Sequence, residues 1–364
     1  MLVLLNGLGW SHGCVDQDRE SLLQLKPFFK YLDWPMKVEE TSSNCCEWKM
    51  VECSATTGRI TKLHLYAGAT ETNLWYLNAS YLSPFEQLTS LDLTRNQLVG
   101  CAENQGFEIL WSRLRKLEVL HLGGNKFSDN IIPSLSGFSS LKTLYLYENE
   151  MGTTLDTRGF ESLWRLSNLE HLDLSWNKFN NSILSSLHGL SSLKDLYLWG
   201  NQLSGTINMQ DFKNLVNLEN LDMSYNEITG FRSFKGDLEV FDWEFLDLRG
   251  NNLSAHVFAS LNGLPHLKSL NLSYNQLRGS IHLKELSGLR NLEELQLSGN
   301  NIEEIVGPED KITLNKLKVL GLAYLQTNGK GLVLKSLGAL STLKTIYLEG
   351  NILNETNPFQ GMKM

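Results

Sequence analysis

Four of the five cysteines lie within the first 53 residues; they are Cys14, Cys45, Cys46 and Cys53. A cluster of this kind ahead of a long cysteine-poor stretch indicates disulfides formed in an oxidising compartment, and four cysteines allow three pairings. A zinc site is the alternative, but adjacent cysteines fit the usual spacing of zinc ligands poorly. The remaining Cys101 is interpreted as a free buried thiol, or else as a redox-sensitive or intermolecular one.

Histidine and aspartate are the other side chains whose spacing could support chemistry. His64 and His121 occupy equivalent positions two turns apart in the repeat described below, and His171 is offset from both. We expect no shared carboxylate to join them, which predicts ordinary surface histidines. One strand position of the Leu-Asp-Leu type could supply carboxylate or metal sites. We expect instead that its side chains hydrogen-bond neighbouring strands and solvent, and recur because the repeat recurs; they are Asp92, Asp173, Asp222 and Asp247.

The sequence contains none of the common catalytic signatures. It has no G-x-x-x-x-G-K-[ST] phosphate loop, no kinase motif, no H-E-x-x-H and no G-x-S-x-G. We therefore predict that the chain is not an enzyme and has no cofactor or metal ion. A formal net charge of −8 also argues against nucleic acid or anionic lipid as the main partner.

The amino-terminal segment MLVLLNGLGWSHG, residues 1–13, has a short apolar run that ends in small residues. It resembles the end of a secretory signal peptide whose charged first part is missing. No later stretch approaches the ~20 apolar residues of a membrane span. The 364 residues are 42% hydrophobic and 20% charged, which is compatible with a folded and soluble chain.

One phrase, L-x-x-L-x-L-x-x-N-x-L, recurs from the end of the first cysteine cluster to the carboxyl terminus. Clear copies include LTSLDLTRNQL from Leu88, LEHLDLSWNKF from Leu169 and LKSLNLSYNQL from Leu267. The steps between copies are 24 to 29 residues, which gives about twelve turns over residues 58–364. The Asn position falls at residues 68, 96, 125, 149, 177, 201, 226, 251, 275, 300, 325 and 351.

Each fixed position of the phrase has a physical reason. In the L-x-L strand the leucines alternate with outward residues, so they point inward and stack on the neighbouring turns. The Asn amide can donate and accept where the chain leaves the strand, which predicts a ladder of stacked Asn side chains. Gly68 and Leu325 stand at two Asn positions. Because Leu325 cannot make these hydrogen bonds, we expect a looser turn there.

Many turns carry a second phrase after the Asn, of the type L-x-G-x-I-P. It is seen in Leu203 to Ile207 and Leu277 to Ile281, and more loosely in Phe127 to Pro133. In this the chain resembles the plant-specific leucine-rich repeats, which have a second strand after the Asn turn. The fold class implied is an α/β repeat solenoid, a right-handed leucine-rich-repeat superhelix with a parallel β-sheet on its concave face. Convex insertions are expected at 101–111 and 152–164.

The first turn of such a solenoid needs a cover, which residues 14–57 are expected to supply. Residues 16–29 predict a helix with an apolar face that Pro27 ends or kinks; the face comprises Leu22, Leu23, Leu25, Phe28 and Phe29. The phrase C-C-x-W-x-x-V-x-C follows from Cys45. It resembles the plant-type leucine-rich-repeat N-terminal cap, and this resemblance implies the disulfides Cys14–Cys45 and Cys46–Cys53.

The cap and repeats together resemble those of plant receptor-like proteins, which are related to receptor kinases but lack the kinase domain. Full-length members continue with more repeats, a C-terminal cap with paired cysteines, an acidic spacer and a membrane helix. This chain ends at Met364 just after a repeat, so we expect no C-terminal cap and interpret it as the front part of such a receptor, or a short secreted relative. It is expected in the apoplast, or at the plasma membrane if the full-length product has the membrane helix.

Outward residues near the middle of the repeats are unusually aromatic, and the repeat itself does not fix them. Exposed Trp and Tyr concentrate at binding hot spots, so this stretch of the concave face is the candidate ligand surface. The alternative is that these rings only stack laterally and stabilise the sheet. The candidate residues are Tyr145, Tyr147, His171, Trp176, Asp195, Tyr197, Trp199 and Tyr225.

Five Asn-x-Ser/Thr triplets are candidate glycosylation sites and fit passage through the secretory route. One of them lies between Leu270 and Leu272 on the strand, where a glycan would block ligand from the concave face. The five asparagines are Asn78, Asn180, Asn252, Asn271 and Asn354.

The resemblance implies a recognition module that senses a peptide, protein or glycan ligand of microbial or cell-wall origin, in defence or development. It would signal through a co-receptor kinase, since the chain has no kinase of its own. The alternative is a secreted inhibitor of a microbial cell-wall-degrading enzyme, similar to the polygalacturonase-inhibiting proteins, which share the cap. The irregular spacing of the repeats favours the receptor.

Overall fold

A computed structural model describes residues 14–29, 32, 34, 44–66, 73–153, 158–232, 241–308, 313–329 and 331–353. The expected signal segment 1–13, Gly68 and the sequon at Asn354 lie outside these residues. The chain forms two compact units, residues 1–150 and 151–364, here called the first and second unit. Among the described helices, none is long and apolar enough to cross a membrane.

The first unit begins with the cap. Helix α1 (Asp16–Leu25) is followed by a 3-10 turn, η1 (Lys26–Phe28), so the regular helix ends before Pro27 as expected, because proline lacks the N–H that would continue it. Leu22, Leu25 and Phe29 are fully buried. We expected Phe28 on the buried face, but it is 41% exposed, and its ring lies 5.9 Å from that of Trp75.

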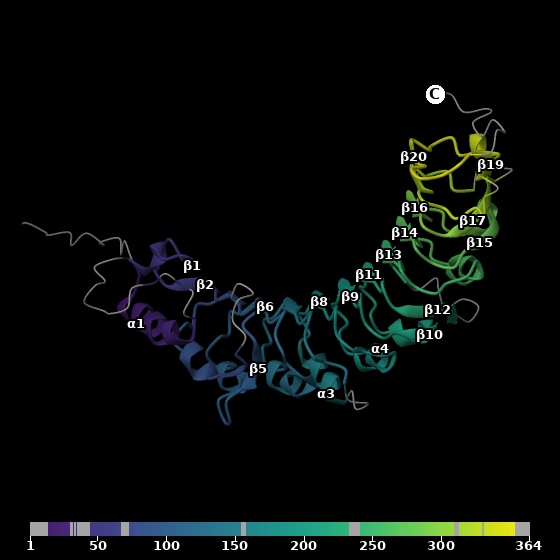
Figure 1. Cartoon of the computed structure of the whole chain (residues 1–364). Coiled ribbons are helices and arrows are strands. Elements are labelled where there is room, and N and C mark those ends of the chain that lie inside the picture. The colour runs from purple at the N-terminus through teal and green to yellow at the C-terminus, as the bar shows by residue number, and fades with distance from the viewer. Residues whose placement is uncertain are drawn as a thin grey trace, which may run out of the picture. The chain divides into compact units, whose positions relative to one another are not determined.

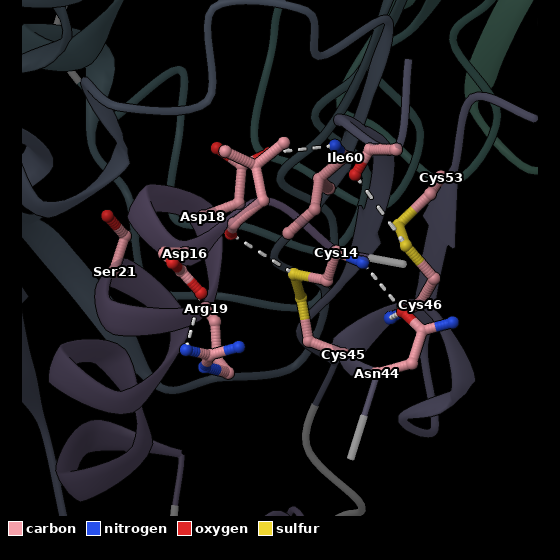
Figure 2. The surroundings of a disulfide bond; sticks show 12 residues. Cys14, Asp16, Asp18, Arg19, Ser21, Asn44, Cys45, Cys46, Cys53 and Ile60 are labelled. Atoms are coloured by element: carbon pink, nitrogen blue, oxygen red, sulfur yellow. Dashed lines mark hydrogen bonds and ion pairs between the residues drawn. A yellow bond between two sulfur atoms is a disulfide. The ribbon is translucent and has the colours of Figure 1, made fainter. Parts of the chain in front are cut away.

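Two disulfides hold the cap together (Figure 2). Cys14 bonds Cys45 with their Cα atoms 5.2 Å apart, and Cys46 bonds Cys53 with theirs 5.5 Å apart. The pairing implied by the resemblance is therefore confirmed. Cys14 lies just before α1, and Cys45 and Cys46 belong to the 3-10 turn η3 (Cys45–Glu47). Cys53 is the last residue of strand β1 (Val51–Cys53).

The cap passes directly into the sheet of the first unit. Strand β1 pairs antiparallel with β2 (Ile60–His64), and from there the pairing is parallel. The order continues through β4 (Ser90–Asp92), β6 (Val119–His121) and β7 (Thr143–Tyr145). A second, two-stranded pair consists of β3 (Trp75–Leu77) and β5 (Leu98–Cys101). Short helical turns follow, namely η4 (Ala79–Leu82), η5 (Phe107–Leu110), η6 (Asp129–Ile131) and α2 (Ile132–Leu135).

The second unit repeats the same plan with three-residue parallel strands along one face (Figure 1). These strands are β8 (His171–Asp173), β9 (Asp195–Tyr197), β11 (Asn220–Asp222), β13 (Phe245–Asp247), β14 (Ser269–Asn271), β16 (Glu294–Gln296), β18 (Val319–Gly321) and β20 (Thr345–Tyr347). Their central residues pair in register, as in Leu196 with Leu221 and Leu221 with Leu246; those of β8 to β18 are fully buried, and Ile346 of β20 is partly exposed. The inward leucines therefore stack from turn to turn as the repeat predicts.

The opposite side of the second unit carries the second strands and the helices (Figure 1). One pair is β10 (Ser204–Asn208) with β12 (Glu227–Arg232), and one triple is β15 (Arg278–His282), β17 (Asn301–Val306) and β19 (Val333–Lys335). Helical segments follow a second strand or take its place: α3 (Arg158–Glu161), η7 (Ser162–Arg165), α4 (Ser182–Ser186), η8 (Met209–Phe212), α5 (Val257–Leu261), η10 (Leu283–Leu286) and η11 (Leu337–Ala339).

The second strand forms only in some turns. Gly205 and Gly279, in the two clear L-x-G-x-I phrases, have φ of +64° and +73° within β10 and β15. The looser phrase from Phe127 lacks this glycine and forms η6 and α2 instead of a strand. The expectation of a second strand is wrong at that turn, where the chain from Asp129 to Leu135 is helical and no residue takes a left-handed conformation.

The asparagine ladder is formed. Asn226 donates from Nδ2 to the carbonyls of Leu198, Met223 and Ser224 at 3.0–3.1 Å, and its Oδ1 accepts from the N–H of Leu203 at 3.0 Å. Each amide thus satisfies its own turn and the preceding one. The buried members are Asn96, Asn125, Asn149, Asn177, Asn201, Asn226, Asn251, Asn275 and Asn300.

Leu325 interrupts this ladder. Its side chain is buried, and its backbone N–H donates to Oδ1 of Asn351 at 2.8 Å, so it receives a contact from the next turn. Its side chain makes no hydrogen bond to the preceding turn, because leucine has no side-chain amide. That this turn is looser stays a prediction.

Candidate ligand-binding surface

We expected all eight candidate residues to lie on strands, but only some of them do. They also do not all belong to one unit. Tyr145 and Tyr147 are in the first unit and the other six in the second. The strands contain only four of them, Tyr145 on β7, His171 on β8, and Asp195 and Tyr197 on β9. The remaining four lie in the turn that leads from the strand to the ladder asparagine: Tyr147, Trp176, Trp199 and Tyr225.

In the first unit, three rings lie together at the carboxyl ends of β6 and β7. His121 stacks on Tyr145 with ring centroids 4.2 Å apart, and Tyr145 meets Tyr147 edge-on at 6.5 Å. The ring of Tyr147 also occupies the space over Gly123, where a Cβ would clash with it. These contacts fix the rings and are the lateral stacking that the sequence left as an alternative.

A carboxylate does join two of the histidines, contrary to expectation. In the sheet register His64 pairs with Asp92, and Asp92 pairs with His121. His64 lies 3.9 Å from the Asp92 carboxylate and 3.6 Å from that of Glu52. The pKa of His121 is lowered overall, first by burial. The charge of Asp92 opposes this shift, and the charge of His64 adds to it. The signal was present in the aligned triplets Leu-His-Leu, Leu-Asp-Leu and Leu-His-Leu of three successive turns.

These groups do not amount to a metal centre: among the described residues no set of three or more His, Cys, Asp or Glu side chains is arranged to hold a metal ion. The aspartates of the second unit have a local role. Oδ1 of Asp173, Asp222 and Asp247 accepts the N–H two residues later at 2.8–2.9 Å, and Asp247 also accepts from Asn271. Burial raises the pKa of each of these three carboxyls. The expected hydrogen bond to a neighbouring strand is present at Asp247, while the role that the three share is to accept a hydrogen bond within their own turn.

A polar cluster lies on β8, β9 and β11 of the second unit. Nδ1 of His171 contacts Oδ2 of Asp195, and Nδ2 of Asn220 donates to the other oxygen of the same carboxylate. Asp195 is 8% exposed, and each of its two carboxylate oxygens contacts a side chain of a neighbouring strand. The Asp195 carboxylate fixes the imidazole of His171, whose side chain stays 41% exposed.

Beside it, Trp176, Trp199 and Tyr225 form an aromatic cleft with Gly200, Asn201 and Arg249, of about 540 Å³. Trp176 and Trp199 meet edge-on at 5.2 Å, and Trp199 lies 6.4 Å from Tyr225. The guanidinium of Arg249 lies 5.0 Å from the Tyr225 centroid as a cation–π contact, and its buried Nε has no hydrogen-bond partner among the described residues.

The sequence reasoning missed Arg249. It occupies the position two residues before a ladder asparagine, as Trp199 does two turns earlier, and the aligned phrases Leu-Trp-Gly-Asn and Leu-Arg-Gly-Asn give the signal. The aromatic cleft therefore combines three large amphipathic rings with one cation. Such a site can hold an apolar or planar group by its face, and it can donate a hydrogen bond to an acceptor at the edge of that group.

Cys101 lies apart from this surface, at the end of β5 in the first unit. It is partly buried and unpaired among the described residues. Burial, followed by the charge of Glu108, raises the pKa of its thiol to about 12. It lines a cavity of about 460 Å³ with Tyr76, Gly100 and Glu108 among the wall residues. A thiol held neutral in this way is a poor nucleophile, which favours the free buried thiol over a redox-sensitive one.

The described sequons differ in what their amides do. Asn78 and Asn180 each accept from the N–H two residues later, at 3.0 and 2.9 Å, at the start of a helical turn. Asn271 lies on β14, where it accepts from Ser273 at 3.0 Å and donates to Asp247 at 3.1 Å. Asn252 is exposed. Glycosylation of these asparagines stays a prediction.

Models of known families match four segments of the chain. A leucine-rich-repeat model matches residues 244–302, and a leucine-rich-repeat N-terminal domain model matches residues 15–54. Two further leucine-rich-repeat models match residues 165–187 and 116–138.

Curated relatives are plant proteins. Receptor-like protein 13 of Arabidopsis thaliana is 34% identical over 258 residues, which is 60% of this chain and 24% of the relative. Receptor-like protein 9a of the same plant is 36% identical over 52% of this chain and 20% of its own length. Cuscuta receptor 1 of Solanum lycopersicum is 29% identical over 63% and 24%. The chain thus spans about a quarter of the length of the relatives it matches.

Solved structures share the fold. The ectodomain in the crystal structure of the Arabidopsis receptor kinase HAESA, in complex with the peptide hormone IDA and the co-receptor SERK1, has a TM-score of 0.58 at 24% identity, over 92% of this chain and 65% of that one. A plant ice-binding protein has a TM-score of 0.57 at 24% identity, over 84% and 96%.

Proposed function

Because this chain is a leucine-rich-repeat protein whose relatives are plant receptor-like proteins, we propose that it is the extracellular ligand-recognition part of such a receptor. Its ligand is a peptide, a microbial molecule or a cell-wall fragment, and its signal passes through a partner kinase. Residues 14–57 form the cap and residues 58–364 the recognition repeats, with no catalytic role assigned. The two cap disulfides support a location outside the cell, in the apoplast or at the plasma membrane.

The observation that carries this proposal is the aromatic cleft of Trp176, Trp199, Tyr225 and Arg249. Large rings with few rotatable bonds give contact area at a low entropic cost, and hot spots are enriched in Trp, Tyr and Arg. Their edge-on packing fixes the rings before any ligand arrives, so little further ordering is needed on binding. The cluster of His171, Asp195 and Asn220 supplies oriented polar groups next to it.

The test uses the secreted full chain, immobilised and exposed to a defined panel of synthetic plant and microbial peptides, oligosaccharides and purified microbial proteins. We expect at least one ligand whose affinity falls by about thirtyfold or more in Trp199→Ala, since removing a hot-spot ring costs about 2 kcal/mol or more. The matched control is Tyr76→Ala, which removes an exposed ring of the first unit and leaves affinity unchanged. A ligand bound equally by both variants would contradict this assignment of the site.

The same preparation decides the inhibitor alternative. We expect no effect on a purified fungal endopolygalacturonase over a range of molar ratios. Stoichiometric inhibition that Trp199→Ala abolishes would replace the receptor proposal with an inhibitor.

A further inference from the structure

One backbone position of the second unit alternates between a large ring and no side chain. It is the residue just before the ladder position of each turn, and it is left-handed throughout, with φ between +51° and +71°. The residues in chain order are Trp176, Gly200, Tyr225, Gly250, Tyr274, Gly299, Tyr324 and Gly350. We call the four aromatic ones, Trp176, Tyr225, Tyr274 and Tyr324, the aromatic row.

Packing explains the alternation. Each ring occupies the space in front of the glycine of the next turn: a Cβ on Gly200, Gly250, Gly299 or Gly350 would come to 3.0 Å or less from the preceding ring. A ring in one turn therefore requires glycine in the next. The glycines let the four rings sit at fixed positions, separated by two turns each.

Packing does not explain why rings are there at all. A left-handed backbone costs a bulky residue of order 1 kcal/mol or more, and glycine occupies the same conformation in alternate turns without this cost. The rings gain little of this back by burial, because the four side chains stay 54%, 46%, 53% and 60% exposed in chain order. Strained, exposed and evenly repeated rings point to a binding role.

We propose that the aromatic row binds a neutral, extended β-1,4-linked glycan chain. Neighbouring parallel strands lie about 4.8 Å apart, so the rings recur at about 9.6 Å and the row extends over about 29 Å. Successive units of a β-1,4-linked chain are turned over, so the same sugar face returns every second unit, at a distance close to this spacing. The apolar face of every second sugar can therefore lie on one ring.

The side chains beside the row favour a neutral chain over an acidic one. The last residues of the neighbouring strands are Asp222, Asp247, Asn271 and Gln296, of which the partly exposed Asp222 and Gln296 can accept hydrogen bonds from sugar hydroxyls. The carboxylates would repel a polyanion such as an oligogalacturonide, and the chain as a whole carries a net charge of −8. One cation beside the row is Arg249 of the aromatic cleft, whose guanidinium lies 5.0 Å from the Tyr225 ring.

A polyproline peptide has a similar repeat, about 9.3 Å for three residues, but proline-rich segments dock in grooves lined by aromatic residues on both sides. Here Trp199 lies beside the start of the row in the aromatic cleft, while the equivalent residues of later turns are small or polar, such as Arg249, Ser273 and Ser298. The geometry thus favours flat sugar faces laid on successive rings.

This inference deepens the proposed function and rests on it for the biological role, but its test is a direct binding measurement. Purified full chain is titrated with cellotetraose and cellohexaose by calorimetry, and with an oligogalacturonide and an oligoproline of similar length. We expect the hexaose, which can cover three rings, to bind about tenfold more tightly than the tetraose, which covers two. The oligogalacturonide and the oligoproline should not bind.

The decisive variant is Tyr274→Gly, because glycine already occupies this position in alternate turns and relieves the strain. Its thermal midpoint should be at least that of the wild type, while affinity for cellohexaose falls about three- to tenfold. Tyr76→Ala is the control and keeps full affinity. Unchanged affinity in Tyr274→Gly, absence of cellohexaose binding, or preferred binding of the oligogalacturonide or oligoproline would each overturn the inference. A peptide bound through Trp199 in a chain that binds no glycan would leave the proposed function intact.

Discussion

At the scale of single residues, the aspartates on the strands are held charged in a setting that disfavours charge. Asp222 has a counterpart in Asn271, which occupies the same register position and accepts the same backbone hydrogen bond, from Ser273 at 3.0 Å. Burial raises the pKa of Asp222 above its usual value, and the hydrogen bond to Ser224 only partly opposes this. The acceptor is therefore needed at this position, and the charge is not.

Asp222→Asn should accordingly raise the free energy of unfolding at pH 7, because it keeps the acceptor and removes the charge that burial disfavours. A carboxyl with a raised folded pKa takes up a proton before the unfolded chain does, so the wild type gains stability as pH falls through the folded pKa toward 3.8. The variant lacks this gain, and the two unfolding curves should converge at low pH. Urea denaturation at pH 7 and pH 4 measures both; a variant less stable than wild type at pH 7 would show that the charge itself is needed.

His121 has the opposite dependence on pH. Its folded pKa is lowered below 6.5, first by burial and also by His64, while Asp92 opposes the shift. The unfolded chain then binds the proton more readily, so stability present above pH 6.5 is lost as pH falls toward the folded pKa. His121→Gln loses the stacking on Tyr145 at every pH, but because it removes the titrating group it should show a smaller fall in thermal midpoint between pH 7.5 and pH 5.5 than the wild type. An equal fall in both proteins would assign the dependence to another group.

At the scale of elements, the ladder gives a test of one missing amide. Leu325 leaves the turn before it without the donor and acceptor that every buried ladder asparagine supplies. Leu325→Asn should restore these bonds and raise the free energy of unfolding by about 1–2 kcal/mol, as two or three buried hydrogen bonds replace one apolar contact. Hydrogen exchange should show increased protection at Ile302, the residue that would donate to the new Oδ1. Destabilisation would mean that the core has adapted to leucine.

The cap helix is tied to the first repeat by a buried carboxylate. Asp18, fully buried on α1, accepts from Nε of Arg59 at 3.0 Å and from the N–H of Ile60 at 2.9 Å. Figure 2 shows Asp18 and Ile60 beside the cap disulfides. Asp18→Ala leaves the guanidinium and the amide without this acceptor and should cost about 3 kcal/mol. Limited proteolysis should then cut near α1 first. The matched variant Asp16→Ala, on the exposed first turn, should behave as wild type.

Which elements form was largely predictable, and what their turns do was less so. The fixed spacing of Leu and Asn determines the strands, the ladder and the sheet order, because each turn buries its apolar face only on a neighbour. The cap pairing followed from the C-C-x-W-x-x-V-x-C phrase. Trp176 and Tyr225 were misplaced on strands because alignment gives register and not φ, and Asp18 was missed because its partner Arg59 is 41 residues away.

At the scale of the whole molecule, a repeat chain passes a disturbance on mainly through nearest neighbours, so the cap disulfides should act locally. Cys14–Cys45 closes a loop of 31 residues and Cys46–Cys53 one of 7. In the chain-entropy treatment the longer loop contributes about 1.3 kcal/mol more stability. The double variant Cys14→Ser/Cys45→Ser should therefore destabilise the cap more than Cys46→Ser/Cys53→Ser does.

The expected pattern in hydrogen exchange follows from that locality. Removing Cys14–Cys45 should lower amide protection most in β1 and β2, less in β4 and β6, and not measurably in β13 to β18, since each turn is stabilised chiefly by the two beside it. Ligand binding by the aromatic row should then survive in this variant at temperatures where the cap is already open. A uniform loss of protection from β2 to β18 would instead show that the described repeats unfold as one cooperative unit, in which the cap supports the binding surface directly.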